Sequence, residues 1–387
     1  MSGIDIDAVR ADTPGCREVV HLNNAGAALP PQQVLTACVD YLEAEARTGG
    51  YEIAMSRAED LDRVYQAGAN LLGCSADEIA FTTSATESWM KAVQAVPFRK
   101  GDRVLATAAE YVANAFGLMR LRNRGLKIDL IPNDEQGMTS VEALENMLDD
   151  RVKLVCATHV PTAGGLVNPV AEIGRVAKSA GAYYLLDACQ SAGQIPLDVD
   201  ELQCDFLALT GRKFLRGPRG SGLLYVRSTA ENLGDPAVMD GHSAAWTDNW
   251  RYEPAAGSQR FETFEYSMAA KVGLGVAIDY ALDVGVEAIA KRVEDLGTRL
   301  RALLGETPLV KLVEGPGPQS GIVSFEVDGR SSDAVVASLR AWGINMSRIA
   351  PQPPAFDPEG RNAKPLIRAS VHYYNSDEEL VDAVAAL

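Results

Sequence analysis

Two charged residues in the middle of the chain lie beside apolar runs, where burying a charge is costly. Lys213 follows the apolar run FLALTG and precedes a glycine-rich turn that enters a second apolar run, so it lies between two buried strands. Asp187 lies near the C-terminal end of the apolar run AYYLLDA, where a carboxylate is costly unless it meets a positive partner. Taken singly, the lysine is a solvated loop charge and the aspartate caps a turn. Strand ends in parallel sheets, however, are also where ligands bind.

A third feature is suited to an anion. In FTTSATESWM a strand runs into a helix, and Ser84 and Glu87 have the spacing of a capping box. The backbone N–H groups of Ala85 and Thr86 are then free to face an anion at the positive end of the helix. A favourable charge at a helix end contributes about 0.3–1 kcal/mol, so this helix does not make a site alone.

The order of the three features along the chain indicates a cofactor. An anion-binding helix start, a buried aspartate and a lysine after a strand are what a pyridoxal-phosphate (PLP) enzyme needs. The lysine forms a Schiff base, and the aspartate pairs with the protonated pyridine nitrogen, which makes the ring an electron sink. We therefore predict pyridoxal 5'-phosphate as the cofactor and an amino-acid-like substrate.

The chain resembles the class V aminotransferase family of fold-type I PLP enzymes, which includes cysteine desulfurases and isopenicillin N epimerase-like proteins. The resemblance covers nearly the whole chain. It is strongest in HLNNAGAALPP, FTTSATES, EYVAN, HVPTAGGLVNP, LLDACQSAGQIPLDV, CDFLALTGRKFLRGPRGSGLLYV and RASVHYYN.

The resemblance implies roles for residues at matching positions. Lys213 would be the Schiff-base lysine and Asp187 the pyridinium partner. Tyr111 stands where the family stacks a ring on the pyridine and could also act in catalysis, and Arg368 would clamp the substrate carboxylate. The other residues implied to bind the cofactor are Ser84, Ala85, Thr86, Thr162, Gln190, Thr210 and Arg212, and those near the substrate are Asn23 and Ala25. No metal site is expected.

The elements that must position these residues follow from the apolar pattern. From about residue 70 to 230, apolar runs without polar alternation are typical of strands covered on both faces. The runs are EIAFTT, RVLATA, KIDLIP, KLVCATH, AYYLLDA, FLALTG and GLLYVR, and amphipathic stretches such as VAEIGRVAKSAG separate several of them. This alternation predicts an α/β domain around a mostly parallel sheet.

The pattern changes after about residue 260. One helical stretch over 267–304 precedes the strand candidates PLVKLVEG and GIVSFEVDG, a helix near 331–342, and the strand–helix pair PLIRASVHYY and SDEELVDAVAAL. We predict a fold-type I α/β architecture. Its parts are an N-terminal segment, 1–30, that contributes to the small domain and active site, a large PLP-binding domain, 31–260, and a smaller α+β domain, 261–387.

Charge and composition disfavour several classes of binding partner. A formal net charge of −16 disfavours sequence-independent nucleic-acid binding and anionic membrane surfaces. The N-terminus lacks a signal-peptide pattern, and no apolar run is long enough to span a bilayer. The six cysteines lack zinc-site spacing. These features predict a cytoplasmic enzyme with a small-molecule substrate and no nucleic-acid or membrane partner.

In the class V aminotransferase family, which this chain resembles, neighbouring subunits complete each other's active sites. The resemblance therefore implies a homodimer. The expected trans contributor is Arg260–Ser267, RFETFEYS, although it differs from the Gly/Thr-rich segment of desulfurases. The proline-rich stretch Pro351–Pro358 is expected to form a loop that covers the substrate.

An absence guides the choice of reaction. Cysteine desulfurases of this family accept sulfur as a persulfide on a mobile C-terminal cysteine, and no cysteine follows Cys204 here. We therefore expect that the chain is not a persulfide-relay desulfurase. A β-elimination needs no protein nucleophile, because Lys213 removes the Cα proton and a thiolate leaves from Cβ. The EYVAN and RFET segments resemble carbon–sulfur lyases and epimerases of secondary metabolism. The expected activity is a C–S lyase that cleaves a cysteine S-conjugate to a thiol, pyruvate and ammonia.

Other reactions of the same cofactor stay open. They are aminotransfer, epimerisation, and decarboxylation or oxidative deamination of an amino acid. Epimerisation needs a second base, for which His372 or Tyr111 could serve. A non-catalytic binding protein is least expected, because Lys213 and Asp187 are both present. A nucleotide enzyme is disfavoured because the GxGxxG and GxxxxGK[ST] motifs are absent.

Overall fold

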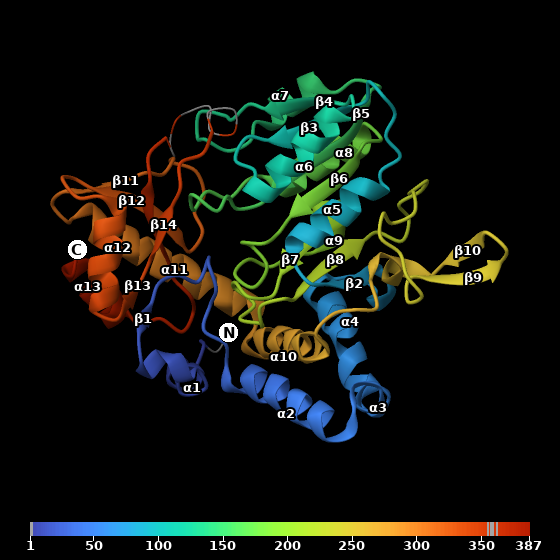
Figure 1. Cartoon of the computed structure of the whole chain (residues 1–387). Coiled ribbons are helices and arrows are strands. Elements are labelled where there is room, and N and C mark those ends of the chain that lie inside the picture. The colour runs from blue at the N-terminus through green and yellow to red at the C-terminus, as the bar shows by residue number, and fades with distance from the viewer. Residues whose placement is uncertain (1–2, 354–355, 357–359, 361–362) are drawn as a thin grey trace.

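The computed structural model describes residues 3–353, 356, 360 and 363–387. Figure 1 shows two lobes, a larger one built on the central sheet and a smaller one that contains the C-terminus. The N-terminal part of the chain runs beneath both lobes. Within the described residues, no helix combines the length and apolar character needed to cross a membrane.

The large lobe is built on a seven-stranded sheet with the order β2-β8-β7-β6-β5-β3-β4. All pairs are parallel except those of β8, which is antiparallel to both β2 and β7. The strands are β2 (Ile79–Thr82), β3 (Arg103–Thr107), β4 (Lys127–Ile131), β5 (Val152–Thr158), β6 (Tyr183–Asp187), β7 (Phe206–Thr210) and β8 (Gly222–Val226). Each predicted apolar run therefore forms a strand, and the predicted mostly parallel sheet is confirmed.

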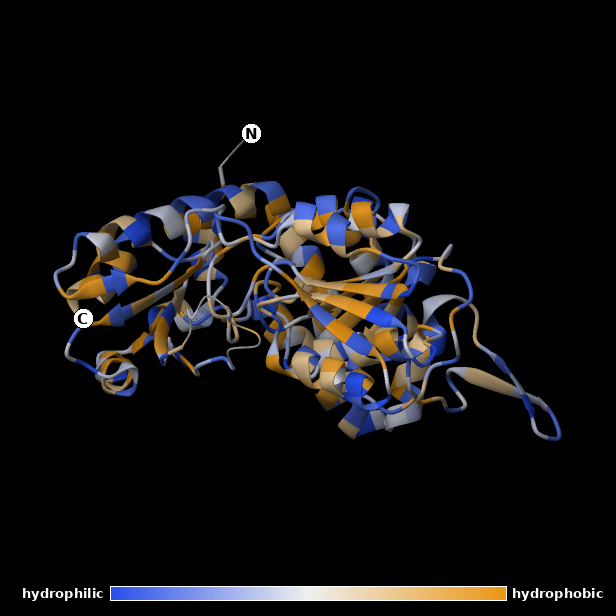
Figure 2. Cartoon of the chain, turned by 90° about the horizontal axis from the view of Figure 1, so that it is seen from above, coloured by the Kyte–Doolittle hydropathy of each residue, from blue (hydrophilic) through white to orange (hydrophobic). Residues whose placement is uncertain are grey.

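Helices cover both faces of this sheet, which explains the unbroken apolar runs. Successive residues of β3 face opposite sides, so Leu105 packs on one core cluster and Val104 on the other. Figure 2 shows the apolar strands between the helices, whose outer faces are hydrophilic. The large-lobe helices are α4 (Ala58–Leu72), α5 (Ala85–Ala95), α6 (Val112–Asn123), α7 (Val141–Met147), α8 (Val170–Ser179) and α9 (Val199–Leu202).

The small lobe holds a four-stranded antiparallel sheet with the order β11-β12-β15-β14. Its elements are α11 (Val286–Gly305), β11 (Val310–Leu312), β12 (Ile322–Val327), α12 (Ser332–Ala341), β13 (Ile344–Asn345), β14 (Ser347–Ile349), β15 (Leu366–Ser370) and α13 (Asp377–Ala385). The N-terminal strand β1 (Val20–His21) pairs with β13, so the start of the chain joins this lobe.

The single helix predicted over 267–304 is two helices. α10 (Met268–Val284) ends and α11 begins at Gly285, whose φ of +93° is a conformation that other residues rarely adopt. α10 packs against α2 and α4 under the large lobe, whereas α11 lies against the small-lobe strands β11 and β12. The break therefore lets one continuous helical pattern contribute to two hydrophobic cores.

Several elements have no counterpart in the sequence-based prediction. Between residues 4 and 73 these are α1 (Ile6–Ala11), α2 (Gln32–Thr48) and α3 (Gly50–Ser56), together with α4. The strands β9 (Ala244–Asp248) and β10 (Arg251–Pro254) form a hairpin that projects from the large lobe. Short 3-10 turns occupy Pro14–Arg17, Ala76–Glu78 and Gly257–Phe261.

Candidate active site

The chemistry gathers at the carboxyl edge of the large sheet. Thr158, Asp187 and Thr210 are the last residues of β5, β6 and β7. These strands are parallel neighbours, so their ends meet on one edge, where α/β proteins bind ligands. A pocket of about 150 Å³ opens there.

Every residue that was predicted to bind the cofactor lines this pocket. These residues are Ser84, Ala85, Thr86, Tyr111, Thr162, Asp187, Gln190, Thr210, Arg212 and Lys213. Residues that the sequence reasoning did not assign also line it, namely Thr83, Asn114, Thr158, Val160, Cys189, Arg219 and Gly220. Their roles at the cofactor stay predictions, but the fold brings the whole set to one place.

Asp187 is buried and held by two donors. Its Oδ1 accepts the backbone N–H of Cys189 at 2.9 Å, and its Oδ2 accepts Asn114 Nδ2 at 2.8 Å. Only 6% of the residue is exposed. Its carboxylate is therefore fixed in direction at the floor of the pocket, ready for a cationic partner.

Lys213 lies on the loop between β7 and β8 and is 7% exposed. A tight turn holds this loop, because Arg216 N–H donates to the Lys213 carbonyl and Gly217 N–H to that of Gly211. Burial lowers the pKa of the Lys213 amine, and nearby Arg212 and Arg368 lower it further, against the opposing effect of Cys189 and Asp187. The neutral amine, which is the form that can attack a carbonyl, is thus favoured.

Tyr111 forms part of the pocket wall. Lys213 Nζ lies 5.8 Å from the centre of its ring, and the residue is 38% exposed. It caps the N-terminus of α6 through its backbone conformation alone, since its side chain makes no capping bond. Its predicted role, stacking on the cofactor ring, stays a prediction.

The start of α5 differs from the predicted capping box. Ser84 Oγ accepts the Glu87 N–H at 3.2 Å as expected. The Glu87 carboxylate, however, accepts from the N–H and hydroxyl of Thr83 and pairs with Lys91 instead of returning to the Ser84 N–H. The reciprocal half of the box is thus wrong, because a buried lysine one turn later competes for the carboxylate.

Positive charge gathers at the same end of the pocket. Arg212 is half-buried, and burial followed by repulsion from Arg219 lowers its pKa. Two guanidinium groups that repel each other in a pocket also lined by the first residues of α5 are suited to a multiply charged anion.

Arg368 lies next to the pocket, at the edge between the two lobes. It comes from β15 and its Nη1 donates to the carbonyl of Thr162 at 2.9 Å and to Thr162 Oγ1 at 2.8 Å. Burial lowers its pKa to about 10, so it stays charged at neutral pH. Its Nε has no hydrogen-bond partner among the described residues, which leaves a donor for an incoming carboxylate.

The N-terminal segment completes this end of the site. Asn23 Oδ1 accepts Arg368 Nη2 at 3.4 Å, and the Ala25 carbonyl accepts Gln190 Nε2 at 3.2 Å. Gln190 also donates to Thr162 Oγ1 at 3.1 Å. Thr162 therefore connects the arginine to Gln190.

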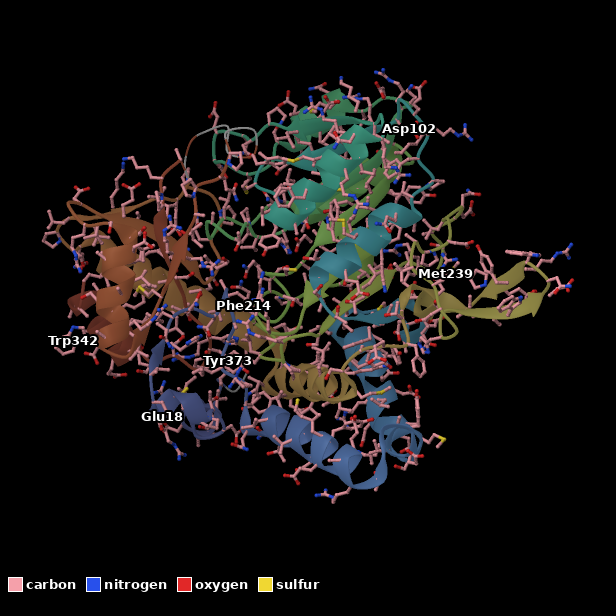
Figure 3. The ribbon with its side chains drawn as sticks, in the orientation of Figure 1. Glu18, Asp102, Phe214, Met239, Trp342 and Tyr373 are labelled. Atoms are coloured by element: carbon pink, nitrogen blue, oxygen red, sulfur yellow. The ribbon has the colours of Figure 1, made fainter. Side chains whose placement is uncertain are left out.

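Three predicted features lie elsewhere. His372 is fully buried between the rings of Phe214 and Tyr374, with centroids 5.5 and 4.9 Å away, and it does not line the pocket. Figure 3 shows Phe214 and Tyr373 close together where the lobes meet. Arg260–Ser267 does not line the pocket of its own chain. Half of the predicted loop Pro351–Pro358 lies outside the described residues, so its role stays a prediction.

Asn114 had a sequence signal that the prediction did not use. In EYVAN, Asn114 follows Glu110 by four residues, a spacing that places both on one side of a helix start. The structure shows both side chains buried, with Asn114 in contact with Asp187. The prediction used only Tyr111 from this motif.

The aminotransferase class-V family profile matches residues 20–384. The chain belongs to the class-V aminotransferase family. The fold is accordingly the fold-type I α/β fold of PLP enzymes, and the cofactor is PLP. The predictions of family, fold class and cofactor are confirmed.

The pocket fits this cofactor. Gln190 Oε1 is buried and has no partner among the described residues, which marks a place for a polar group of the ligand. Asp187 would hold the pyridine nitrogen, the α5 N-terminus with Arg212 the phosphate, and Lys213 the aldehyde carbon.

Similar proteins span nearly the whole chain. A probable cysteine desulfurase of Methanothermobacter thermautotrophicus is 29% identical over 96% of this chain and 94% of its own. A cysteine desulfurase of an Enterobacter species is 30% identical over 99% and 97%. Among solved structures, the cysteine desulfurase of Thermococcus onnurineus has a TM-score of 0.89 at 28% identity, covering 100% and 97%. A cystine C–S lyase solved with its reaction product cysteine persulfide has a TM-score of 0.87 at 25% identity, covering 96% and 98%.

These comparisons correct the expected reaction. Cleavage of a cysteine S-conjugate in secondary metabolism is wrong, and so is the exclusion of cysteine desulfurases, because the similar proteins carry that name. The exclusion rested on a missing cysteine after Cys204. A missing thiol bears on where the sulfur goes, but it leaves the groups around the cofactor unchanged.

Proposed function

We propose that this protein is a PLP-dependent cysteine desulfurase, which transfers the sulfur of L-cysteine to a thiol acceptor. One observation carries the proposal: Lys213 and Asp187 meet in one buried pocket of a chain whose end-to-end relatives are named cysteine desulfurases. With a thiol as acceptor, L-cysteine and the thiol become alanine and a persulfide. One carbon–sulfur bond breaks and one sulfur–sulfur bond forms, so the reaction needs no further oxidant or reductant.

The residues of the chain divide the work. PLP, when bound, supplies the electron sink that makes the bonds at Cα and Cβ labile. Arg368 binds the carboxylate of the substrate and so orients it, and Tyr111 covers the open face of the site. Lys213 holds and moves the proton at Cα, for which its lowered pKa suits it. Asp187 stabilises positive charge at the pyridine nitrogen.

The acceptor thiol comes from outside the pocket. Cys189 lines the pocket, but burial raises the pKa of its thiol well above the ordinary value and so disfavours the reactive thiolate. No cysteine follows Cys204. A free thiol or a partner protein therefore serves as acceptor in this proposal.

The products test the proposal. PLP-loaded protein is incubated with L-cysteine and dithiothreitol, and alanine, sulfide and pyruvate are quantified, with Lys213→Ala as control. We expect alanine and sulfide in equal amounts, both lost in the variant. Pyruvate in place of alanine would overturn the desulfurase proposal in favour of elimination.

We further propose that the protein works as a homodimer, with the interface beside the site. Val112, Phe116 and Met119 form an exposed apolar stripe on α6, which begins just after Tyr111. Tyr51 and Phe264 form a second exposed aromatic pair, with ring centroids 6.2 Å apart. Apolar surface of this kind, next to a catalytic pocket, is typical of a subunit interface.

A charge placed in the stripe tests the dimer. Phe116→Glu should convert the dimer to a monomer in sedimentation-velocity experiments. Trp342→Glu is the matched control, because Trp342 is also an exposed aromatic residue but lies on the far side of the small lobe. A monomeric wild type, or an unchanged mass for Phe116→Glu, would contradict the proposed interface.

A further inference from the structure

A buried carboxyl group lies behind the cofactor pocket and takes no part in the proposed reaction. Glu110 is 2% exposed and does not line the pocket. It follows the end of β3 and precedes α6, so it lies beneath the carboxyl edge of the sheet. No ion pair to a lysine or arginine is found for it among the described residues. A buried carboxyl group without a cation is costly and calls for an explanation.

Three donors surround this carboxyl group. Thr107 Oγ1 donates to Oε1 at 2.6 Å, while Thr158 Oγ1 and Asn114 Nδ2 donate to Oε2, each at 3.0 Å. The Thr107 hydroxyl oxygen already accepts the Thr158 N–H at 3.1 Å, so its own proton is free for Glu110. This arrangement has the donors that an ionised carboxylate needs.

The same amide connects Glu110 to Asp187. Asn114 Nδ2 has two hydrogens, and it donates to Asp187 Oδ2 at 2.8 Å as well as to Glu110. Both hydrogens of the amide are thus used, one for each carboxylate. The direction of Asp187 Oδ2 therefore depends on Asn114, whose own position depends on Glu110. Thr158 gives a second link, because it donates to Glu110 and also lines the pocket.

We propose that Glu110 is a positioning residue that holds Asp187, through Asn114, in the geometry and electrostatic field required to pair with the pyridine nitrogen. The proposal rests on the cofactor site of the proposed function and not on its substrate. Negative charge at Glu110 adds to that of Asp187 and so raises the affinity of the bound cofactor for its protons. Loss of the carboxylate lowers that affinity and loosens Asp187.

The surroundings allow Glu110 to change charge near neutral pH. Burial raises its pKa to about 7, with the Asp187 charge acting in the same direction and the three donors against it. The titratable groups that face it are Asp187 and Tyr184 on β6 and Cys156 on β5. Burial raises the pKa of both Cys156 and Tyr184, so these two stay neutral and Asp187 is the charge that Glu110 meets.

The test measures the absorbance and the binding of the cofactor, and not the sulfur product. Wild type, Glu110→Gln, Asn114→Ala and the double variant are loaded with PLP. The visible absorbance of each PLP-loaded protein is recorded from pH 6 to 9 to obtain the pH midpoint of its change. The PLP dissociation constant is measured at each pH. Tyr184→Phe is the matched control, because it removes a fully buried hydroxyl that faces Glu110 but donates its hydrogen bond to the Val170 carbonyl and not to Glu110.

We expect both single variants to move the absorbance midpoint to lower pH, by roughly one unit, and to weaken PLP binding about tenfold. The double variant should resemble the single variants, because both act through one link. Tyr184→Phe should titrate like the wild type. An unchanged absorbance midpoint for Glu110→Gln, together with a PLP dissociation constant within twofold of wild type, would overturn the proposal. Additive effects in the double variant would also overturn it. If Glu110→Gln does not fold, an unchanged Asn114→Ala overturns it. These readouts do not depend on whether cysteine is the substrate.

Discussion

At the scale of single residues, burial lowers the pKa of two basic side chains at the site, one that lines the pocket and one beside it. Lys213 and Arg368 are both more than nine-tenths buried, and burial lowers the pKa of each. For the lysine, this favours the neutral amine that reacts. The arginine, with its higher ordinary pKa, keeps its charge and can still bind a carboxylate.

Arg368→Ala should raise KM for cysteine by roughly 100-fold, because charged hydrogen bonds to the substrate carboxylate are lost. PLP affinity should stay within twofold, since Arg368 does not line the pocket and its hydrogen bonds to described residues go to Thr162 and Asn23. Steady-state kinetics and PLP titration measure the two effects. Arg368→Lys keeps the charge without the fork and should lose less. Weakened PLP retention would instead place this arginine on the cofactor.

His159 should make stability depend on pH. Burial lowers the pKa of its imidazole to about 4, against 6.5 for an exposed histidine. Between pH 6.5 and 4 the unfolded chain binds a proton that the folded protein does not. The free energy of unfolding therefore falls as the pH falls, by about 3 kcal/mol across this window.

Urea unfolding of wild type and His159→Asn at pH 7, 5.5 and 4.5 measures this contribution. The stability difference between the two proteins should shrink as the pH falls. His242→Asn is the control of opposite sign, because Glu262 raises the pKa of His242. Parallel pH profiles for wild type and His159→Asn would contradict the assignment.

At the scale of elements, helix ends do the positioning. α5 begins at the pocket and α12 begins on the opposite lobe, and each has a serine whose hydroxyl caps the first turn at 3.2 Å. The two caps are alike in geometry, but only the first faces an anion site. They therefore allow the contribution of the pocket to be separated from that of the helix.

Ser84→Ala and Ser331→Ala should each lower the free energy of unfolding of the PLP-free protein by about 1 kcal/mol. Only Ser84→Ala should also weaken PLP binding, because the first turn of α5 faces the phosphate. Thermal unfolding and PLP titration give the two quantities. Equal PLP affinity in both variants would argue against a phosphate at this helix end.

Gly285→Ala should destabilise the protein by about 1–2 kcal/mol, because alanine tolerates a positive φ poorly. A Cβ there would meet nothing closer than 3.9 Å, so the cost comes from the backbone and not from a clash. Gly305→Ala, at the end of α11 with open space around it, should be neutral or stabilising. The same sign for both variants in urea unfolding would contradict this account.

At the scale of the whole molecule, one buried guanidinium joins three parts of the chain. Arg216 is 1% exposed, and its Nε donates to the Leu29 carbonyl and its Nη1 to Tyr373 OH, both at 2.8 Å. A third bond goes to Thr13 Oγ1. The loop that carries Lys213 is thereby tied to the N-terminal segment and to the small lobe, next to Phe214 and Tyr373 in Figure 3.

Arg216→Met should cost about 3 kcal/mol of unfolding free energy, since it leaves buried acceptors unpaired. It should also expose the N-terminal segment to limited proteolysis. Arg227→Met is the matched control, because the hydrogen bonds of Arg227 to described residues go to Val199, Asp200 and Cys204, all within the large lobe. Equal protection of the N-terminus in both variants would show that Arg216 does not hold it.

The sequence by itself determined the large sheet, because each strand covered on both faces leaves an unbroken apolar run of its own. It also brought Lys213, Asp187 and Ser84 to one pocket, since all three follow such runs and parallel strands end on one edge; Thr83, Asn114, Thr158 and others that line it were not foreseen. Patterning could not locate the break at Gly285, because apolar residues recur at helical spacing through both α10 and α11, although two different cores bury them.

Only the tertiary structure decided the contacts between distant segments. It placed Glu110 and Asn114 behind Asp187 and buried His372 between aromatic rings. It also paired the Glu87 carboxylate with Thr83 and Lys91. Hydrogen bonds of this kind depend on distances across the fold, which local spacing does not encode. The reaction was mispredicted for a related reason: the thiol that accepts sulfur is not one of the groups that hold the cofactor.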